Sequence, residues 1–399
     1  MNILFLTMSR LYTLEQEGIY PDLLNEFVNN GHNVCVAAPA ERRMGEATNL
    51  KRYDGYSVLR IKVGNLQKTN IIEKGISTVL LERQFLRAIR KYYSDIKFDV
   101  VMYSTPPITF SGVIDYIKKR DDAKSYLLLK DIFPQNAVDL GMFAKGSIFY
   151  KYFRNKEKQL YRQSDYIGCM SQANVEFVLK NNPEIDPKRV HISPNSIKAI
   201  DIEKNAQKRT EVRRKYNIPE SATVFVYGGN LGRPQGIPFL VECLRANAQK
   251  NDRFFVVCGT GTEYSKLKVY ADSEKQENFL LINGLPKTEY EELVTACDVG
   301  LIFLDKRFTI PNFPSRLLSY MQNGMPVISC TDKNTDIGKV IEEGGFGWHT
   351  ISDNTDEFTR AVDKACTAPL DEMGEKALSV LKRDYTSERC YNIIMENLK

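Results

Sequence analysis

IPNFPSRLLSYMQNGMPVISC, residues 310–330, predicts a loop, a helix and a buried strand in direct succession. Two prolines favour the loop, and Ser315 is well placed to cap the helix that follows. Gly324 ends that helix and Pro326 prevents its continuation, so that Val327 begins a strand. This succession is typical of the connection between two parallel strands in an α/β protein.

The start of this helix is a candidate anion site. Its free N–H groups and its dipole favour phosphate, and Arg316 adds a full positive charge. The alternative is an ordinary connection between strands in which Arg316 is a solvated surface charge. The stretch by itself supports the two interpretations equally.

Length and composition indicate a globular protein of two domains. The chain has 399 residues, more than one ordinary hydrophobic core accommodates. Its hydrophobic and charged fractions, 43% and 26%, are typical of soluble proteins, and its net charge of +5 is too small to indicate a nucleic-acid partner. The longest apolar runs are far shorter than the roughly 20 residues of a membrane-spanning helix. The chain begins directly with a strand rather than a signal peptide, so we expect a cytoplasmic protein.

The cysteines predict neither disulfides nor a zinc site. All eight occur singly, mostly within apolar stretches, and no C-x-x-C motif is present. We therefore expect reduced thiols in the core, and no metal site.

Apolar runs in the first half have the length and composition of buried parallel strands. They are Asn2–Thr7, Asn33–Ala38, Asp99–Ser104 and Ser125–Leu129. Lys130 and Asp131 directly follow the last run, where open parallel sheets bind their ligands. Asp131 is therefore a functional candidate, and the alternative is a carboxylate that caps a helix or loop.

Basic and aromatic residues interleave between residues 145 and 162, KGSIFYKYFRNKEKQLYR. Phe149, Tyr152 and Phe153 fall on one face of a predicted helix. This pattern fits a solvated helix with an aromatic core stripe. It also fits a docking surface for anionic lipid, where each basic residue contributes about 1 kcal/mol. No stretch resembles a known RNA-binding module, so RNA is a less attractive partner.

The second half repeats the strand-and-loop pattern after a polar stretch that extends to about Arg214. Three of its strands end in glycine-containing loops, which let backbone amides approach a phosphate closely. The loops are 228–236, 259–261 and 283–285. We expect an N-terminal domain of residues 1–200, completed by a helix at 384–399, and a C-terminal domain of residues 201–383.

These motifs together resemble retaining glycosyltransferases of family 4. The resemblance covers nearly the whole chain and is most specific in the second half. It rests on the glycine loop G-N-L-G after the first strand, the later glycine loops, and P-S-R-x-x-x-Y-x-x-x-G-x-P-V at residues 314–327. It implies the α/β GT-B fold, with two Rossmann-like domains whose parallel sheets face each other across a cleft.

Two motifs of the first half resemble a narrower subgroup, which builds bacterial capsule, O-antigen or exopolysaccharide. They are K-D-I-F-P at Lys130 and P-N-S-I at Pro194. The resemblance implies transfer of an N-acetylamino or deoxy sugar from a nucleotide-sugar donor, with UDP as the expected nucleotide. The acceptor would be lipid-linked or a saccharide. The enzyme would work in the cytoplasm, at the inner face of the plasma membrane.

The resemblance also implies roles for individual residues. Gly229 and Asn230 would lie against the donor diphosphate, with Arg233 or Arg316 neutralising it. Leu285 would lie near the base. The remaining donor positions are Gly18, which would meet the diphosphate from across the cleft, Gln235, Gly259, Pro314, Ser315 and Ser319. On the acceptor side, Asp131 would face the acceptor or the reacting sugar, next to Lys130.

The sequence departs from the wider family at its two most typical charged motifs. The usual glutamates of E-x7-E correspond to Pro311 and Ser319. The usual arginine and lysine of the first glycine loop correspond to Asn230 and Gln235. We therefore expect Arg316 to act as a displaced phosphate clamp, because a guanidinium can pair with phosphate through two hydrogen bonds.

The chemistry implied is retaining transfer without metal or cofactor, and no D-x-D run is present. The main requirement is stabilisation of the leaving diphosphate. Two alternatives remain open. One is another GT-B enzyme, an inverting transferase or a nucleotide-sugar epimerase. The other is a non-catalytic nucleotide-binding subunit of a transferase complex, which the absent glutamates favour.

Overall fold

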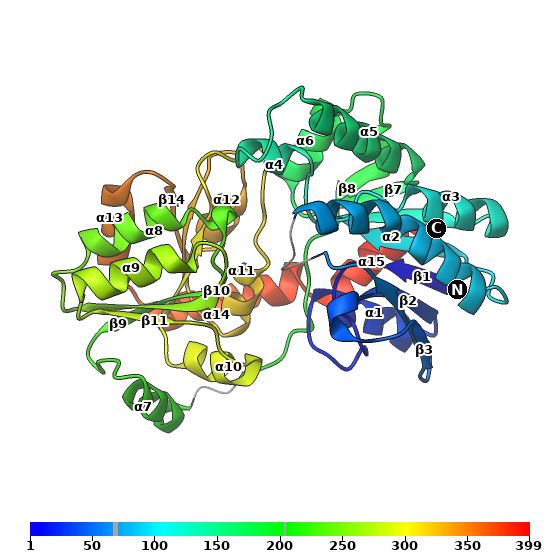
Figure 1. Cartoon of the computed structure of the whole chain (residues 1–399). Coiled ribbons are helices and arrows are strands. Elements are labelled where there is room, and N and C mark those ends of the chain that lie inside the picture. The colour runs from blue at the N-terminus through cyan, green and yellow to red at the C-terminus, as the bar shows by residue number, and fades with distance from the viewer. Residues whose placement is uncertain (67–70, 203–204) are drawn as a thin grey trace. The chain divides into compact units, whose positions relative to one another are not determined.

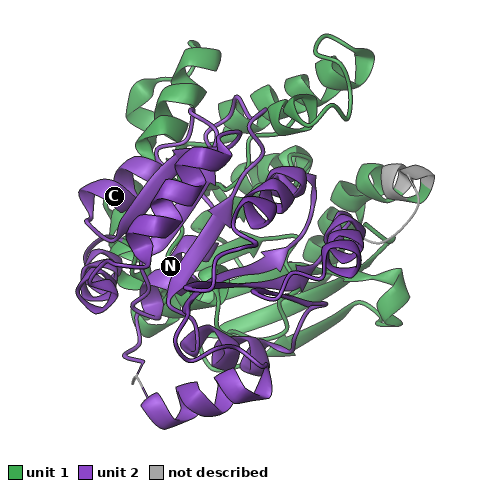
Figure 2. Ribbon diagram, turned by 90° about the vertical axis from the view of Figure 1, so that its left-hand side faces the viewer, with its two compact units in different colours: residues 1–198, 385–399 green, residues 199–384 purple. Residues whose placement is uncertain are grey.

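The computed structural model describes residues 1–66, 71–202 and 205–399, and only the backbone of residues 71, 72 and 74–76. Residues 203 and 204 of the expected linker lie outside this range. The chain forms two compact units, shown in different colours in Figure 2. Unit 1 comprises residues 1–198 and 385–399, and unit 2 comprises residues 199–384. These limits lie within two residues of the boundaries predicted from the sequence.

Unit 1 is built on an eight-stranded sheet among the described residues, in the order β3-β4-β2-β1-β5-β6-β7-β8. Every pair is parallel except β3 with β4. The strands are β1 (Asn2–Leu6), β2 (Asn33–Glu41), β3 (Asn49–Arg52), β4 (Tyr56–Val63), β5 (Val100–Ser104), β6 (Lys124–Leu129), β7 (Tyr166–Cys169) and β8 (Val190–Ile192).

Helices cover both faces of this sheet (Figure 1). The two helices α1 and α15 pack together against one apolar face, whose core includes Phe5, Phe27 and Ile394. Helix α2 contacts β4 and α3, while α3 contacts α5. The helices are α1 (Ile19–Asn29), α2 (Ile71–Tyr92), α3 (Ser111–Asp121), α4 (Gln135–Asp139), α5 (Ile148–Gln163), α6 (Gln172–Asn181) and α15 (Ser387–Leu398).

Unit 2 contains a fully parallel sheet of six described strands, in the order β11-β10-β9-β12-β13-β14. This is the strand order of a dinucleotide-binding Rossmann sheet, with β9 at its centre. The strands are β9 (Thr223–Asn230), β10 (Arg253–Thr260), β11 (Phe279–Ile282), β12 (Val299–Phe303), β13 (Val327–Thr331) and β14 (Gly347–Ile351).

The core of unit 2 on one face is formed where α8, α9 and α13 meet the sheet, and includes Phe225, Leu240 and Phe358. Helices α11 and α14 pack together. The helices are α7 (Ala206–Lys215), α8 (Ile237–Ala246), α9 (Tyr264–Glu274), α10 (Lys287–Thr295), α11 (Arg316–Gln322), α12 (Ile337–Glu343), α13 (Thr355–Ala365) and α14 (Leu370–Asp384).

The loop–helix–strand succession predicted for residues 310–330 is confirmed as the connection from β12 through α11 to β13. One detail is wrong. Ser315 occupies the N-cap position, but it has helical dihedral angles and its side chain makes no capping hydrogen bond. Helix α11 is also only seven residues long. Its dipole is therefore a weaker anion attractor than the sequence suggests, and the charge of Arg316 matters more.

All eight cysteines are free thiols, as predicted, and seven of them are buried.

Candidate functional site

Two loops leave neighbouring strands at the centre of the unit 2 sheet. Strand β9 lies between β10 and β12, and the chain leaves β9 toward one side and β12 toward the other. Such a switch point, at the carboxyl ends of the strands, is where open α/β sheets bind ligands. The glycine stretch that begins at Gly228 forms the last three residues of β9 and continues into the loop after it, so the strand is longer than the sequence predicts. The stretch leading to Arg316 follows β12.

The Arg316 side chain lies directly against the glycine loop. Its Cζ atom is 4.1 Å from the centroid of the Tyr227 ring. A Cβ atom built on Gly229 would lie 2.7 Å from Arg316 Nη2, and Gly229 itself has a φ of 113°. Only glycine combines this backbone conformation with room for the guanidinium. The structure thus brings together two residues that the sequence nominates separately.

The positive charge of Arg316 has no carboxylate partner within the described ranges. Burial by itself would lower its pKa, but the phenol groups of Tyr227, Tyr320 and Tyr290 offset this, and the net pKa lies above the ordinary value. The guanidinium therefore stays protonated, and its charge is available to an anionic ligand.

Asn230 and Gln235 stand where related enzymes carry a basic pair, and here they bond to each other. Asn230 Nδ2 donates to Gln235 Oε1 at 2.9 Å, and the same oxygen accepts the Gly232 N–H at 3.0 Å. The Tyr227 hydroxyl donates to the Asn230 carbonyl at 2.8 Å. These bonds fix the glycine loop in one conformation and supply no cation to it.

Gly259 packs the carboxyl end of β10 against the carboxyl end of β9, where the two glycine loops begin. In the parallel register of β9 and β10 it is the partner of Gly229. A Cβ atom at residue 259 would overlap the Gly229 carbonyl oxygen, which is a backbone atom and cannot simply rotate away. The close approach of the two loops therefore depends on glycine at this position.

Gly259→Ala is expected to displace the loop at Gly229 and to destabilise unit 2 by about 1–3 kcal/mol, the usual cost of overpacking. Thermal denaturation with and without UDP measures both effects. Gly141→Ala is the control, because a Cβ atom there meets nothing within 4 Å. Gly141 has a φ of 71°, unlike Gly259, so the control carries a backbone cost of its own but should leave UDP binding unchanged. Equal UDP affinity for Gly259→Ala and wild type would contradict the expectation.

Further donor positions nominated from the sequence also lie in unit 2: Leu285 and Pro314 in loops, Arg233 in a 3-10 helix, Ser315 at the N-cap of α11 and Ser319 within α11. Leu285 follows β11 and is half-buried, as is Pro314 in front of α11. Arg233, Ser315 and Ser319 are exposed.

In unit 1, Lys130 and Asp131 follow the end of β6, as predicted, and a neighbouring loop braces their backbone. Thr105, which follows β5, accepts hydrogen bonds from the Lys130 and Asp131 N–H groups at 3.1 and 3.2 Å. Its hydroxyl donates to the Asp131 carbonyl at 3.0 Å. One threonine therefore fixes the turn that presents both side chains.

The two side chains have shifted pKa values of opposite sense. Burial raises the pKa of Asp131 to about 6, although Asn136, whose Nδ2 donates to both carboxylate oxygens at 2.8 Å, favours the ionised form. Burial lowers the pKa of Lys130 to about 8. The Lys130 Nζ atom donates to the carbonyls of Ser193 and Pro194, each at 3.3 Å. Both groups are charged between these two pH values.

A second buried carboxylate, Glu157, is electrostatically coupled to Asp131. Burial raises the pKa of Glu157 to about 7, against the opposing effects of Arg154 and Tyr161, and the charge of Asp131 raises it further. Arg154 Nη1 donates to Glu157 at 2.7 Å and the Tyr161 hydroxyl donates at 2.8 Å. Both carboxylate oxygens of Glu157 therefore accept a hydrogen bond, and Glu157 with Arg154 has the geometry of a structural ion pair.

Gly18 is the N-cap residue of α1, in the loop after β1. Its N–H donates to the Asp22 carboxylate at 3.2 Å, so this amide already has a partner inside unit 1.

Three residues of the site were not nominated from the sequence: Tyr227, Thr105 and Asn136. Tyr227 lies in an apolar strand and resembles any core tyrosine in the sequence. Asn136 lies in the short helix α4, five residues after Asp131, and carries no sequence signal of its own. Thr105 carries no sequence signal beyond its position at a strand end.

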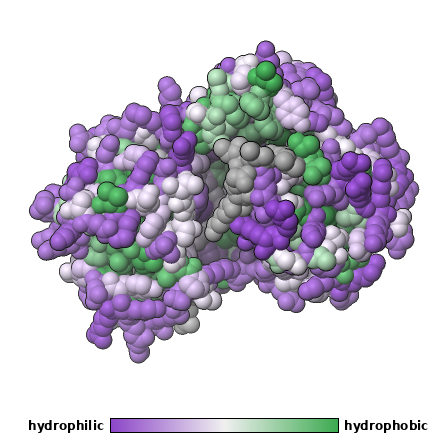
Figure 3. Space-filling view, in the orientation of Figure 1, coloured by the Kyte–Doolittle hydropathy of each residue, from purple (hydrophilic) through white to green (hydrophobic). Residues whose placement is uncertain are grey.

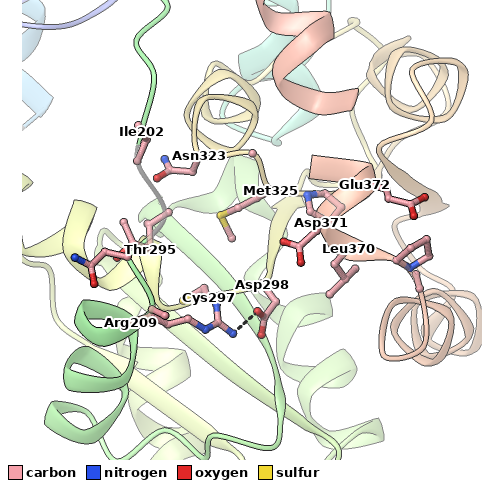
Figure 4. A pocket seen from close by; sticks show the side chains of 17 residues that line it. Ile202, Arg209, Thr295, Cys297, Asp298, Asn323, Met325, Leu370, Asp371 and Glu372 are labelled. Atoms are coloured by element: carbon pink, nitrogen blue, oxygen red, sulfur yellow. Dashed lines mark hydrogen bonds and ion pairs between the residues drawn. The ribbon is translucent and has the colours of Figure 1, made fainter. Parts of the chain in front are cut away.

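A cavity of about 790 Å³ lies elsewhere in unit 2 (Figure 4). It is lined by residues that precede β12 and β13, such as Asp298 and Pro326, and therefore opens at the amino-terminal edge of the sheet. Arg209 donates to Asp298 across it at 2.6 Å. Since ligands of parallel sheets bind at the opposite edge, we do not assign the donor to this cavity.

Within the described ranges, no three His, Cys, Asp or Glu side chains group in a way that could hold a metal ion. Every helix in the same ranges is too short or too polar to cross a lipid bilayer.

Comparison with known proteins bears on the family and the fold of this chain. Residues 208–379 match the family model “Glycosyl transferases group 1”. The chain is 26% identical over 322 residues to “Probable glycosyltransferase WbjE” of Pseudomonas aeruginosa, and the alignment covers 80% of this chain and 78% of the relative.

Solved structures match almost the whole chain at low sequence identity. Sucrose-phosphate synthase of Thermosynechococcus elongatus gives a TM-score of 0.76 at 13% identity, covering 99% of this chain and 98% of the other. Anabaena Alr3699/HepE in complex with UDP and glucose gives a TM-score of 0.72 at 13% identity, covering 100% and 99%. These structures confirm the expected GT-B fold, and the family match and the curated relative support glycosyltransferase activity.

Proposed function

We propose that this chain, a glycosyltransferase related to the group 1 family, transfers a sugar from a UDP-sugar to a lipid-linked or saccharide acceptor, with retention of anomeric configuration. The donor sugar is an N-acetylamino or deoxy sugar, and the product enters a cell-surface polysaccharide. Unit 2 binds the donor and unit 1 binds the acceptor. The sequence motifs of the surface-polysaccharide subgroup and the likeness to a structure that contains UDP and glucose support this proposal.

One observation carries the proposal: the Arg316 guanidinium lies against Gly229 and has no carboxylate partner among the residues that the structure describes. Loss of a nucleoside diphosphate from an anomeric carbon leaves negative charge on the diphosphate, and its stabilisation is the largest catalytic requirement. A fixed guanidinium and the backbone amides of a glycine loop meet this requirement without a metal ion. This arrangement argues against a decayed, non-catalytic subunit, despite the absent glutamates.

On the acceptor side, Asp131 is suited to bind a sugar hydroxyl. The half-buried carboxylate can accept the hydroxyl proton while the leaving diphosphate assists same-face attack. Lys130 donates to the carbonyls of Ser193 and Pro194, which follow β8, two strands away from β6 in the sheet. Asp131 therefore acts in transfer rather than in donor binding.

The test is a transfer assay with labelled UDP-sugars and the lipid fraction of bacterial membranes. We expect label to enter the organic phase with one UDP-sugar, in the presence of EDTA. Conversion of the UDP-sugar without any acceptor would instead indicate an epimerase. Nucleotide binding with no transfer to any acceptor would favour the non-catalytic subunit.

The proposal extends to a site of action at the inner face of the membrane, through the segment from Met142 to Tyr152. Its large apolar side chains are exposed: Met142 by 62%, Ile148 by 84%, Phe149 by 67% and Tyr152 by 49%. Figure 3 shows hydrophobic residues gathered over the part of unit 1 where Figure 1 labels α4 to α6. An aromatic core stripe, the alternative from the sequence, is therefore wrong for Phe149 and Tyr152.

The charges of this segment fit an anionic lipid surface, but fewer of them are available than the sequence suggests. Lys145 and Lys151 are exposed. Arg154, in contrast, pairs with the buried Glu157, and Lys158 approaches Glu184 at 3.6 Å. The lipid-docking surface expected for residues 145–162 is therefore confined to the first half of that stretch. There, apolar side chains can insert between lipid headgroups and lysines can pair with lipid phosphates.

The double substitution Ile148→Ser and Phe149→Ser is expected to reduce cosedimentation with phosphatidylglycerol vesicles severalfold, because it removes the apolar contact. Val269→Ser is the matched control, since Val269 is 67% exposed on unit 2. Binding should weaken with added salt and after Lys145→Gln with Lys151→Gln. Absence of vesicle binding by the wild type at low salt would contradict this part of the proposal.

A further inference from the structure

Arg316 differs from Arg245, which also lies over a tyrosine ring in the described part of unit 2. Arg245 lies over Tyr270 at 5.4 Å and pairs with Glu274 at 3.2 Å. Arg316 is closer to its ring, at 4.1 Å, and has no carboxylate partner among the described residues. An arginine paired with a carboxylate has its charge neutralised, whereas Arg316 lies over the Tyr227 ring and hydrogen-bonds to that neutral side chain, so its charge stays available to an anion.

Tyr227 contacts the site through both its ring and its hydroxyl. The ring is fully buried in the core of unit 2 and supports the guanidinium. The hydroxyl donates to the Asn230 carbonyl and so fixes the turn of the glycine loop. One rigid side chain therefore sets the position of the cation relative to the loop amides.

The same loop has a second candidate cation, Arg233, which provides a useful contrast. Arg233 is exposed and lies in a short 3-10 helix that spans residues 233–235. To hold a phosphate it would lose side-chain freedom on binding, whereas Arg316 is already ordered by its ring. Because Arg316 loses less side-chain entropy on binding, we expect it to contribute more than Arg233 to the free energy of diphosphate binding.

We infer that Tyr227 is a positioning residue for the donor diphosphate: it holds Arg316 over Gly229 and replaces the basic pair that Asn230 and Gln235 do not supply. The inference rests on the proposed UDP-sugar site. According to this inference, Arg316 and Tyr227 together make the protein bind a nucleoside diphosphate more tightly than the bare nucleoside. Only Arg316 touches the ligand.

The test compares UDP and uridine binding to full-length variants. Tyr227→Leu removes the ring and is expected to weaken UDP binding about 10- to 30-fold, as for loss of a desolvated cation–π contact. Uridine binding should change less than about twofold, because the nucleoside does not reach the clamp. Tyr227→Phe keeps the ring and should retain most of the UDP affinity. Arg245→Ala is the control for loss of an arginine–tyrosine pair elsewhere.

Because Tyr227 is buried, Tyr227→Met is a second variant that fills the volume without an aromatic face. It should behave like Tyr227→Leu. Three outcomes would overturn the inference: wild-type UDP affinity in both variants, equal losses for uridine and UDP, or a loss in Tyr227→Phe as large as in Tyr227→Leu. These differ from failure of the proposed function, in which the wild type itself does not bind UDP.

Discussion

Arg316→Ala is expected to weaken UDP binding by about 1.5–3 kcal/mol, roughly 10- to 150-fold, because it removes the charged hydrogen bonds of the clamp. The guanidinium is already fixed on Tyr227 and against Gly229, so little side-chain entropy offsets this loss. Transfer should fall at least as far, since the same charge stabilises the diphosphate as it leaves. Calorimetric titration with UDP measures the binding effect.

A matched control separates the clamp from a general loss of positive charge. Arg307 lies on the same connection after β12 and pairs with Asp305 at 2.7 Å. Arg307→Ala removes the same charge from unit 2 but should leave UDP affinity within about twofold of wild type. Equal UDP affinity for Arg316→Ala and Arg307→Ala would remove Arg316 from the donor site.

Asp131→Asn is expected to reduce transfer by at least about 100-fold, the usual effect of removing a group that moves a proton. UDP affinity should stay unchanged, because Asp131 belongs to unit 1 and the clamp belongs to unit 2. Asparagine also loses the charge that accepts both Nδ2 hydrogen bonds of Asn136. Asp115→Asn, an exposed carboxylate on α3, is the control.

The role of Asp131 also predicts the direction in which transfer activity changes with pH. Burial raises the pKa of Asp131 to about 6, so transfer that needs the carboxylate should decline as the pH falls through this value. The decline should occur in the Asp115→Asn control and be absent from the residual activity of Asp131→Asn. An unchanged acid limb in Asp131→Asn, or full activity of this variant, would exclude Asp131 from the reaction.

The fold could be predicted from the sequence because its signals are local. Apolar runs of strand length, followed by glycine loops or by Lys130 and Asp131, mark the carboxyl ends of parallel strands. The succession of residues 310–330 sets the connection from β12 to β13. For Arg316 the local signal left a surface charge equally well supported, and its assignment as the clamp, which stays a prediction, came from the family resemblance and the absent basic pair at Asn230 and Gln235.

The rest of the site depends on contacts between elements that are distant in the chain. Tyr227 and Arg316 are 89 positions apart, and only the adjacency of β9 and β12 brings them together. Likewise, Thr105 reaches Lys130 from the neighbouring strand β5. Periodicity could not separate a core stripe from an exposed face at Phe149, because both have the same spacing.

The most direct test of the central claim is a calorimetric titration of the wild-type chain with UDP in the presence of EDTA, beside ADP, GDP and TDP. The account predicts saturable binding of UDP, at least about tenfold tighter than of the other three nucleotides and insensitive to EDTA. Absence of UDP binding, or binding that requires a divalent metal, would contradict a donor site built from Arg316 and the glycine loops.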